Sequence, residues 1–109
     1  SQTAMDFMRN PENELLFSVG SMWEIAIKVS KDKLPLSIPY RPWLEKGMVD
    51  IGAQILPIEI SHLELQSTLP WHHKDPFDRM LIAQAQKEKI PVISSDDKFD
   101  LYQIQRIWH

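Results

Sequence analysis

Acidic side chains stand at two points in the second half of the chain where an active site could form. Asp75 and Asp78 open an expected helix, and Asp96 and Asp97 follow the strand-like segment 91–94. A carboxylate at a helix start and another just past the next strand can meet at one edge of a sheet. Clusters of oxygen ligands suit Mg²⁺ or Mn²⁺ and the phosphate chemistry that these ions support. The pattern therefore predicts a metal-dependent nuclease.

Glu24 is a third candidate ligand, on a helix that follows the first expected strand. In a parallel α/β layout a helix starts near the carboxyl end of the strand before it, so Glu24 and Asp78 can both face the edge where Asp96 emerges. Three converging carboxylates repel one another and destabilise the fold unless a cation lies between them. A divalent ion would resolve this conflict.

Each of these residues also has an ordinary structural explanation. Glu24 can pair with Lys28, four residues later on the same helix. Asp78 can stabilise the positive end of its helix dipole, and Asp96 can shape the turn after a strand. Asp75 already supplies a helix cap, so Asp78 is not needed for that role. The combination is therefore more specific than any single residue.

A small basic cluster stands beside Asp78 and consists of His72, His73, Lys74 and Arg79. It could hold a phosphate backbone, or it could be an ordinary solvated loop, and the sequence leaves both interpretations open. A histidine-based zinc site is disfavoured, because the two histidines are adjacent and lack partners at ligand spacing.

The composition is that of a globular protein, with 43% hydrophobic and 25% charged residues. There is no cysteine, which excludes disulfides and thiol catalysis and suits the reducing cytoplasm. No apolar run approaches the ~20 residues of a membrane span and no signal peptide opens the chain, so we expect no membrane partner. The net charge of −3 supplies no overall attraction for nucleic acid, so RNA would need local basic residues and bound cations.

Helices and strands alternate along the chain. Expected helices cover 3–9, 21–31, 43–49, a short stretch from 61, and 76–89, and expected strands cover 15–19, 54–58, 92–94 and 104–108. The helix from Pro76 is the clearest, because Asp75 can cap it and proline suits a first turn. Such alternation implies one α/β domain over 1–109 with a mainly parallel sheet covered by helices on both faces.

Three segments together resemble a known family. SMWEIAIK at 21–28 with KLPL at 33–36, HKDPFDRMLIAQA at 73–85, and VISSDDKF at 92–99 resemble the signature of PIN-domain ribonucleases of the VapC toxin type. The resemblance covers nearly the whole chain in the expected order. It implies a three-layer α/β/α fold and a cytoplasmic, Mg²⁺- or Mn²⁺-dependent endoribonuclease. It also implies a cognate antitoxin as partner, and a homodimer.

The resemblance assigns roles to individual residues. The family's metal-binding, catalytic carboxylates carry over onto Glu24, Asp78 and Asp96. Ser94 falls where the family has a threonine or serine that supports the site, and Asp97 is a possible auxiliary ligand. The implied reaction is in-line attack of a metal-activated water on an RNA phosphodiester. The residues expected to bind the RNA substrate are basic: Lys28, His73 and Arg79.

In one respect the chain departs from the family pattern. The family begins with a central strand that ends in a metal-binding aspartate, and no such segment stands here. We therefore expect a chain of only these residues to be catalytically impaired. Two alternatives remain open: an inactive PIN-fold module that holds a partner helix in an apolar groove, and a nuclease of the same fold in RNA processing. The RNA target and the choice between Mg²⁺ and Mn²⁺ are not encoded in any segment that we can identify.

Overall fold

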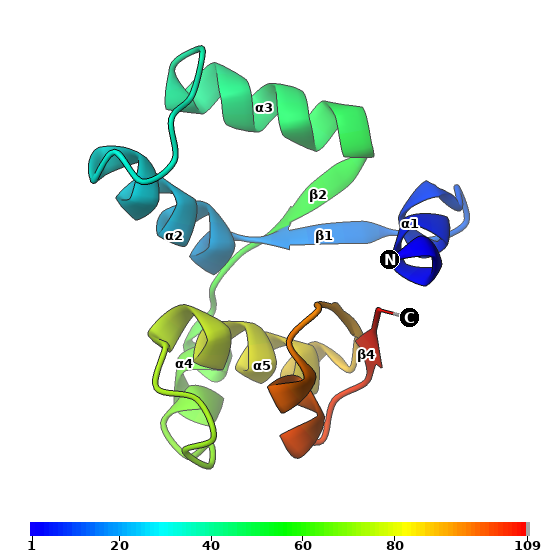
Figure 1. Cartoon of the computed structure of the whole chain (residues 1–109). Helices are drawn as coiled ribbons and strands as arrows, with labels where there is room; N and C mark the ends of the chain where they lie inside the picture. Colours follow the sequence, from blue (N-terminus) through cyan, green and yellow to red (C-terminus); the bar gives the residue numbers. More distant parts are fainter. Residues whose placement is uncertain (109) are drawn as a thin grey trace. The chain divides into compact units, whose positions relative to one another are not determined.

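The computed structural model describes residues 1–108, which form two compact units (Figure 1). The N-terminal unit contains residues 8–57, and the C-terminal unit contains residues 1–7 and the chain from residue 58. The expectation of a single domain over 1–109 therefore stays a prediction. The end of that range, His109, lies outside the described residues.

The N-terminal unit is built on two parallel strands. Strand β1 (Leu15–Ser18) pairs with β2 (Ala53–Leu56), from Leu15 opposite Ala53 to Ser18 opposite Leu56. Parallel strands need a crossover connection, and helices α2 (Val19–Ser30) and α3 (Tyr40–Ile51) provide it. The two helices are tied together by the Tyr40 hydroxyl, which donates to the Met22 carbonyl oxygen at 2.7 Å.

Local chemistry explains where these elements begin and end. Ser18 is both the last residue of β1 and the cap of α2, because its Oγ accepts a hydrogen bond from the Gly20 N–H at 3.1 Å. The helix expected from 21 therefore begins earlier, at Val19. Helix α3 ends at Ile51 and is capped by Gly52, whose φ of 66° is the left-handed conformation that favours glycine. Strand β2 stops before Pro57, which has no N–H for a ladder.

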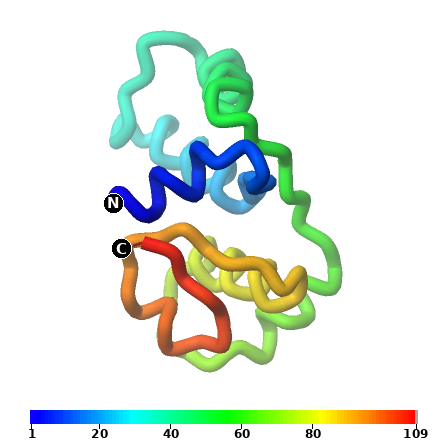
Figure 2. Tube along the Cα trace, turned by 90° about the vertical axis from the view of Figure 1, so that its right-hand side faces the viewer, coloured from blue at the N-terminus to red at the C-terminus, as the bar shows by residue number. Residues whose placement is uncertain are grey.

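The C-terminal unit packs helices against a second pair of parallel strands. Helix α4 (Ile60–Gln66) lies against α5 (Pro76–Glu88), and β3 (Val92–Ile93) pairs with β4 (Arg106–Ile107). Figure 2 shows the red C-terminal segment returning beside the orange segment that contains β3. A 3₁₀ helix, η1 (Asp97–Leu101), connects the two strands, and α1 (Gln2–Arg9) opens the chain. The buried core of this unit consists of Leu69, Ile82, Ala83, Ala85, Val92, Phe99 and Tyr102.

The α/β class and the parallel strand pairing are confirmed. The expected single sheet is not what residues 1–108 form, since β1 pairs with β2 and β3 with β4 in two separate two-stranded sheets. Two-stranded pairs need packing against helices for stability, and each unit supplies those helices. The three-layer arrangement stays a prediction. The expected strand 104–108 is reduced to Arg106–Ile107.

The start of α4 also differs from expectation. A short helix was expected from 61, but α4 begins at Ile60, with Glu59 as its N-cap residue. The Glu59 N–H donates to Nδ1 of His62 at 3.0 Å, and the His62 side chain is completely buried. A histidine thus takes the place of the Glu or Gln that usually closes a capping box.

Candidate metal centre

The start of α5 places Asp78. Asp75 caps the helix, because its Oδ1 accepts hydrogen bonds from the N–H groups of Phe77 at 2.8 Å and Asp78 at 3.0 Å. Pro76 occupies the first helical position, where its missing N–H costs nothing. The capping role expected for Asp75 is confirmed. Asp78 lies in the first turn of α5 and is half-buried.

The end of β3 places Asp96. The Asp96 N–H donates to Oγ of Ser94 at 3.1 Å, and the Asp96 Oδ1 accepts from the Lys98 N–H at 3.0 Å. Arg106 braces the same turn, since its Nη1 donates to the Ser94 carbonyl oxygen at 3.2 Å. Ser94 therefore fixes the backbone of Asp96, the residue that carries the carboxylate.

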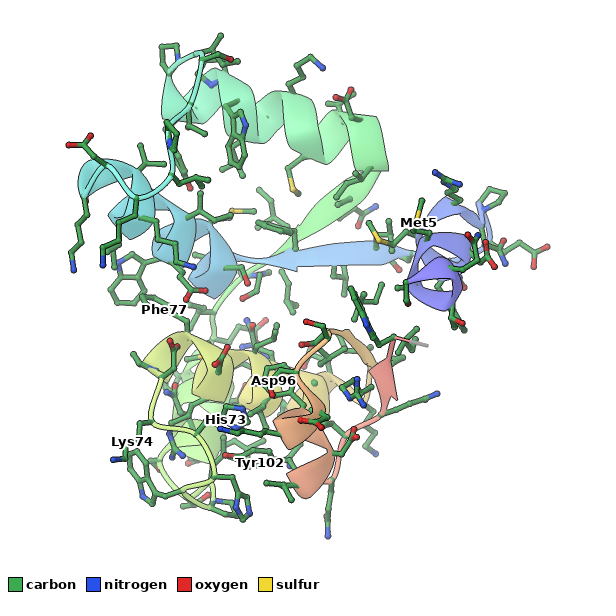
Figure 3. The ribbon with its side chains drawn as sticks, in the orientation of Figure 1. Met5, His73, Lys74, Phe77, Asp96 and Tyr102 are labelled. Atoms are coloured by element: carbon green, nitrogen blue, oxygen red, sulfur yellow. The ribbon has the colours of Figure 1, made fainter. Side chains whose placement is uncertain are left out.

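His73 reaches the same place from the loop before α5. The residue is only 7% exposed, and its Nε2 lies 3.1 Å from Oδ2 of Asp96 (Figure 3). The hydrogen bonds from His73 and from the Lys98 N–H hold the pKa of the Asp96 carboxyl below its ordinary value of 3.8, against the effect of burial. The Asp96 carboxylate is therefore ionised at neutral pH, as a metal ligand must be.

These side chains form a compact donor cluster. One ligand atom each from His73, Asp78 and Asp96 lies within 4.8 Å of the others. The three residues come from the loop before α5, the first turn of α5 and the turn after β3. Two carboxylates and an imidazole fit a divalent cation, because each can supply a lone pair and the carboxylates balance its charge. The convergence of Asp78 and Asp96 matches the expectation from the sequence.

The place of His73 in this cluster was not foreseen. The sequence suggested that His73 binds RNA, but its buried ring faces Asp96. Two adjacent histidines before a helix do not indicate in the sequence that one of them will face Asp96. The orientation of the ring depends on a residue 29 positions later, because Nδ1 of His73 lies 3.3 Å from the Tyr102 hydroxyl.

Glu24 belongs to the other unit, on α2. Its Oε2 lies 3.9 Å from Nζ of Lys28, which is the ion pair that the ordinary explanation predicted. The pair is partly solvated and is worth little to stability. The roles of Glu24 as a metal ligand and of Lys28 in RNA binding stay predictions.

Arg79 has a structural position that the sequence did not suggest. Its side chain is buried, and the residue is only 3% exposed. Nη1 donates to the Pro70 carbonyl oxygen at 2.9 Å, and Nη2 donates to the carbonyls of Gln66 at 3.0 Å and Leu69 at 3.3 Å. The guanidinium also lies 3.7 Å from the centre of the Trp71 ring. These contacts occupy the guanidinium in a structural role, and the role of Arg79 in RNA binding stays a prediction.

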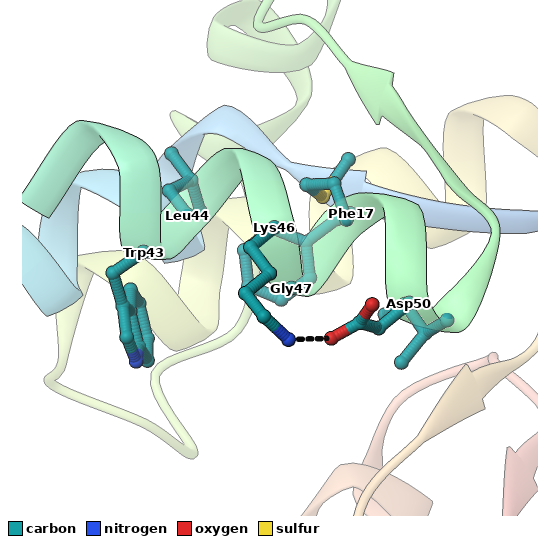
Figure 4. Close-up of a pocket in the computed structure, with 8 residues that line it drawn as sticks. Phe17, Trp43, Leu44, Lys46, Gly47 and Asp50 are labelled. Atoms are coloured by element: carbon teal, nitrogen blue, oxygen red, sulfur yellow. Dashed lines mark hydrogen bonds and ion pairs between the residues drawn. The ribbon is translucent and has the colours of Figure 1, made fainter.

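The N-terminal unit carries a separate shallow hollow of 340 Å³ (Figure 4). Its lining is mostly apolar and includes Lys46 and Asp50, which form an exposed ion pair at 2.8 Å along α3. The hollow is lined by Phe17, Trp43, Leu44, Lys46, Gly47, Met48, Asp50 and Ile51. This lining lacks the paired carboxylates of the donor cluster and suits an apolar contact rather than a reaction.

One comparison with known proteins gives a family that fits the donor cluster. No helix among residues 1–108 combines the length and apolar character needed to cross a membrane. Neither the curated proteins nor the solved structures gave a significant match to the chain. The family model of the PIN domain, however, matches residues 1–104. PIN domains are generally metal-dependent nucleases and typically bind divalent metals. The chain therefore belongs to the PIN domain family.

Proposed function

We propose that this protein is a Mg²⁺- or Mn²⁺-dependent endoribonuclease of the VapC toxin type. The observation that carries the proposal is the donor cluster at the start of α5, in a chain of the PIN family. Phosphodiester hydrolysis needs negative charge to hold cations and a fixed geometry around the reacting phosphate. Asp78 and Asp96 supply that charge on the ends of regular elements, which hold them in place.

Each residue has a defined task in this proposal. Asp78 and Asp96 would hold the cation, with Glu24 as a further carboxylate. Ser94 keeps Asp96 in position through the hydrogen bond from the Asp96 N–H. Lys28, whose side chain is exposed, adds positive charge for the RNA backbone. A bound divalent ion would lower the pKa of a water molecule and offset the charge that develops on the phosphate.

The test is cleavage of a panel of structured RNAs, with and without Mn²⁺. The unaltered chain is compared with Glu24→Gln and Asp96→Asn, and circular dichroism establishes that each variant is folded. We expect cleavage that depends on the metal and falls at least about 100-fold in both variants, as for loss of a group that stabilises transition-state charge. Cleavage that persists in chelator, or is equal in Asp96→Asn, would refute the proposal.

The toxin assignment adds a cognate antitoxin as partner, a homodimer and a cytoplasmic location. These rest on the resemblance of segments 21–28, 73–85 and 92–99 to VapC-type proteins. Growth arrest on expression, relieved by the product of a neighbouring small gene, would support the toxin. Normal growth with active RNA cleavage would instead favour a PIN nuclease in RNA processing.

A catalytically inactive, partner-binding module is the second candidate. The apolar hollow beside α3 favours it, because an amphipathic helix can place apolar side chains in such a surface. The two candidates differ in metal dependence, since only the nuclease loses its function with Asp96→Asn while keeping its fold.

A further inference from the structure

His73 is held more firmly than a residue that only lines a loop. Its ring packs against Phe99 with 5.0 Å between ring centres, and its backbone N–H donates to the Tyr102 hydroxyl at 3.0 Å. The Tyr102 side chain is itself part of the buried core. The imidazole therefore has one orientation, with Nδ1 toward Tyr102 and Nε2 toward Asp96.

Tyr102 allows both neutral forms of this imidazole. Its hydroxyl lies 3.3 Å from Nδ1 of His73 and 3.2 Å from the Pro70 carbonyl oxygen, so it can donate to either. With the proton on Nε2, His73 donates to Asp96 and Nδ1 accepts from Tyr102. With the proton on Nδ1, His73 donates to Tyr102, which donates to Pro70, and the Nε2 lone pair faces the carboxylates. Metal-binding histidines in proteins are held in this second way, by a partner on the other ring nitrogen.

The distances fit a shared cation. Metal–ligand bonds of about 2.1 Å in octahedral geometry put neighbouring ligand atoms about 3.0 Å apart and opposite ones about 4.2 Å apart. Nε2 of His73 and Oδ2 of Asp96 are separated by 3.1 Å, which matches a neighbouring pair. The carboxylate of Asp78 offers an oxygen within 4.8 Å of both.

We infer that His73 is a nitrogen ligand of the metal held by Asp78 and Asp96, and that Tyr102 orients it for this role. The inference rests on the proposed metal site and adds to its carboxylates a ligand of different chemistry. Imidazole binds Mn²⁺ and later transition ions better than it binds Mg²⁺, which prefers oxygen. The consequence is a site that selects Mn²⁺ over Mg²⁺.

The experiment uses the whole chain with Mn²⁺ as the probe. Electron paramagnetic resonance counts bound Mn²⁺, and its pulsed form detects a nitrogen bonded directly to the ion. We expect a nitrogen coupling in the unaltered protein and its loss in His73→Asn and His73→Gln. Mn²⁺ affinity should fall by about 10- to 100-fold in His73→Asn, while Mg²⁺ affinity, measured by competition, changes little.

Two further variants separate ligation from structural effects. His72→Phe removes the neighbouring imidazole but keeps an aromatic ring beside Tyr102, whose ring centre lies 5.1 Å from that of His72, and it should leave the coupling and the affinity unchanged. Tyr102→Phe keeps the buried ring and removes only the hydroxyl, and it should lower Mn²⁺ affinity about 10-fold. Because His73→Gln can place an amide oxygen near the lost Nε2, it should bind Mn²⁺ more tightly than His73→Asn. Circular dichroism establishes that each protein is folded.

The outcomes are distinguishable. Stoichiometric Mn²⁺ binding without nitrogen coupling, unchanged in the His73 variants, would overturn the inference and leave the nuclease proposal standing. A coupling that survives in folded His73→Asn would also overturn it, since the nitrogen would then come from elsewhere. No Mn²⁺ binding by the unaltered protein would refute this inference and the metal site of the proposed function together.

Discussion

Arg79 offers a direct test of how the C-terminal unit is held together. Its guanidinium is buried and donates to main-chain carbonyls at the end of α4 and in the loop that leads to α5. The two shorter hydrogen bonds, at 2.9 and 3.0 Å, come from a charged donor and contribute about 1.5 kcal/mol each. The contact with the exposed Trp71 ring adds about 0.5 kcal/mol. We therefore expect Arg79→Met to lower the free energy of unfolding by about 3 to 4 kcal/mol.

The assay is urea-induced unfolding followed by circular dichroism. Arg79→Lys should lower the free energy of unfolding by about 2 kcal/mol, because the single ammonium group of lysine cannot contact all the carbonyl oxygens that the planar guanidinium reaches. Arg41→Lys is the matched control, since Arg41 forms an exposed pair with Glu45 and its replacement should cost less than about 0.5 kcal/mol. The same proteins are tested for RNA binding at low temperature, where all are folded. If Arg79→Met lost less than about 0.5 kcal/mol but bound RNA at least 10-fold more weakly, the structural role would be refuted and the predicted role in RNA binding supported.

Three other substitutions test the local chemistry, each by urea unfolding. His62→Phe should lose about 1 to 3 kcal/mol, because it leaves the Glu59 N–H without its buried acceptor; a loss equal to that of an exposed substitution would contradict this bond. Gly52→Ala should lose about 1 kcal/mol from backbone strain alone, since its φ is 66° and an added methyl group meets no neighbour; no loss would mean that the turn relaxes freely. Asp75→Ala removes a helix cap, so it should lower the free energy of unfolding by about 1 kcal/mol and leave Mn²⁺ binding intact. Asp78→Asn should abolish Mn²⁺ binding with little change in stability. The reverse result would exchange the roles assigned to these two aspartates.

Local sequence was sufficient for some parts of the site. Asp75 and Pro76 predict the start of α5, because capping and the first helical turn depend only on neighbouring residues. The strand expected over 54–58 was too long at its end, because β2 stops at Leu56, before the proline that has no N–H for a ladder. The convergence of Asp78 and Asp96 could also be expected, since a helix start and a strand end meet at one edge in parallel α/β structure.

Other features depended on residues far apart in the chain. The sequence places Arg79 in a basic cluster, and nothing near it shows that the carbonyls of Gln66 and Pro70 converge on its side chain. A charged residue in a helix is usually solvated, so its burial cannot be read from periodicity. The separation into two strand pairs was also missed, because alternation of elements indicates parallel pairing but not which strands are neighbours.

The sequence by itself determined the class of the protein: an α/β chain of the PIN family with two aspartates set to meet beside one helix start. The family follows from the resemblance of segments 21–28, 73–85 and 92–99 and from the matching family model. The α/β class follows from hydrophobic periodicity, capping residues and turn residues, all of which act over a few positions. Only the tertiary structure decided that His73 turns toward Asp96 and that Arg79 turns away from solvent. The physical reason is that both orientations depend on long-range partners, the Tyr102 hydroxyl for one and the carbonyls after α4 for the other, which come together only when the core has packed.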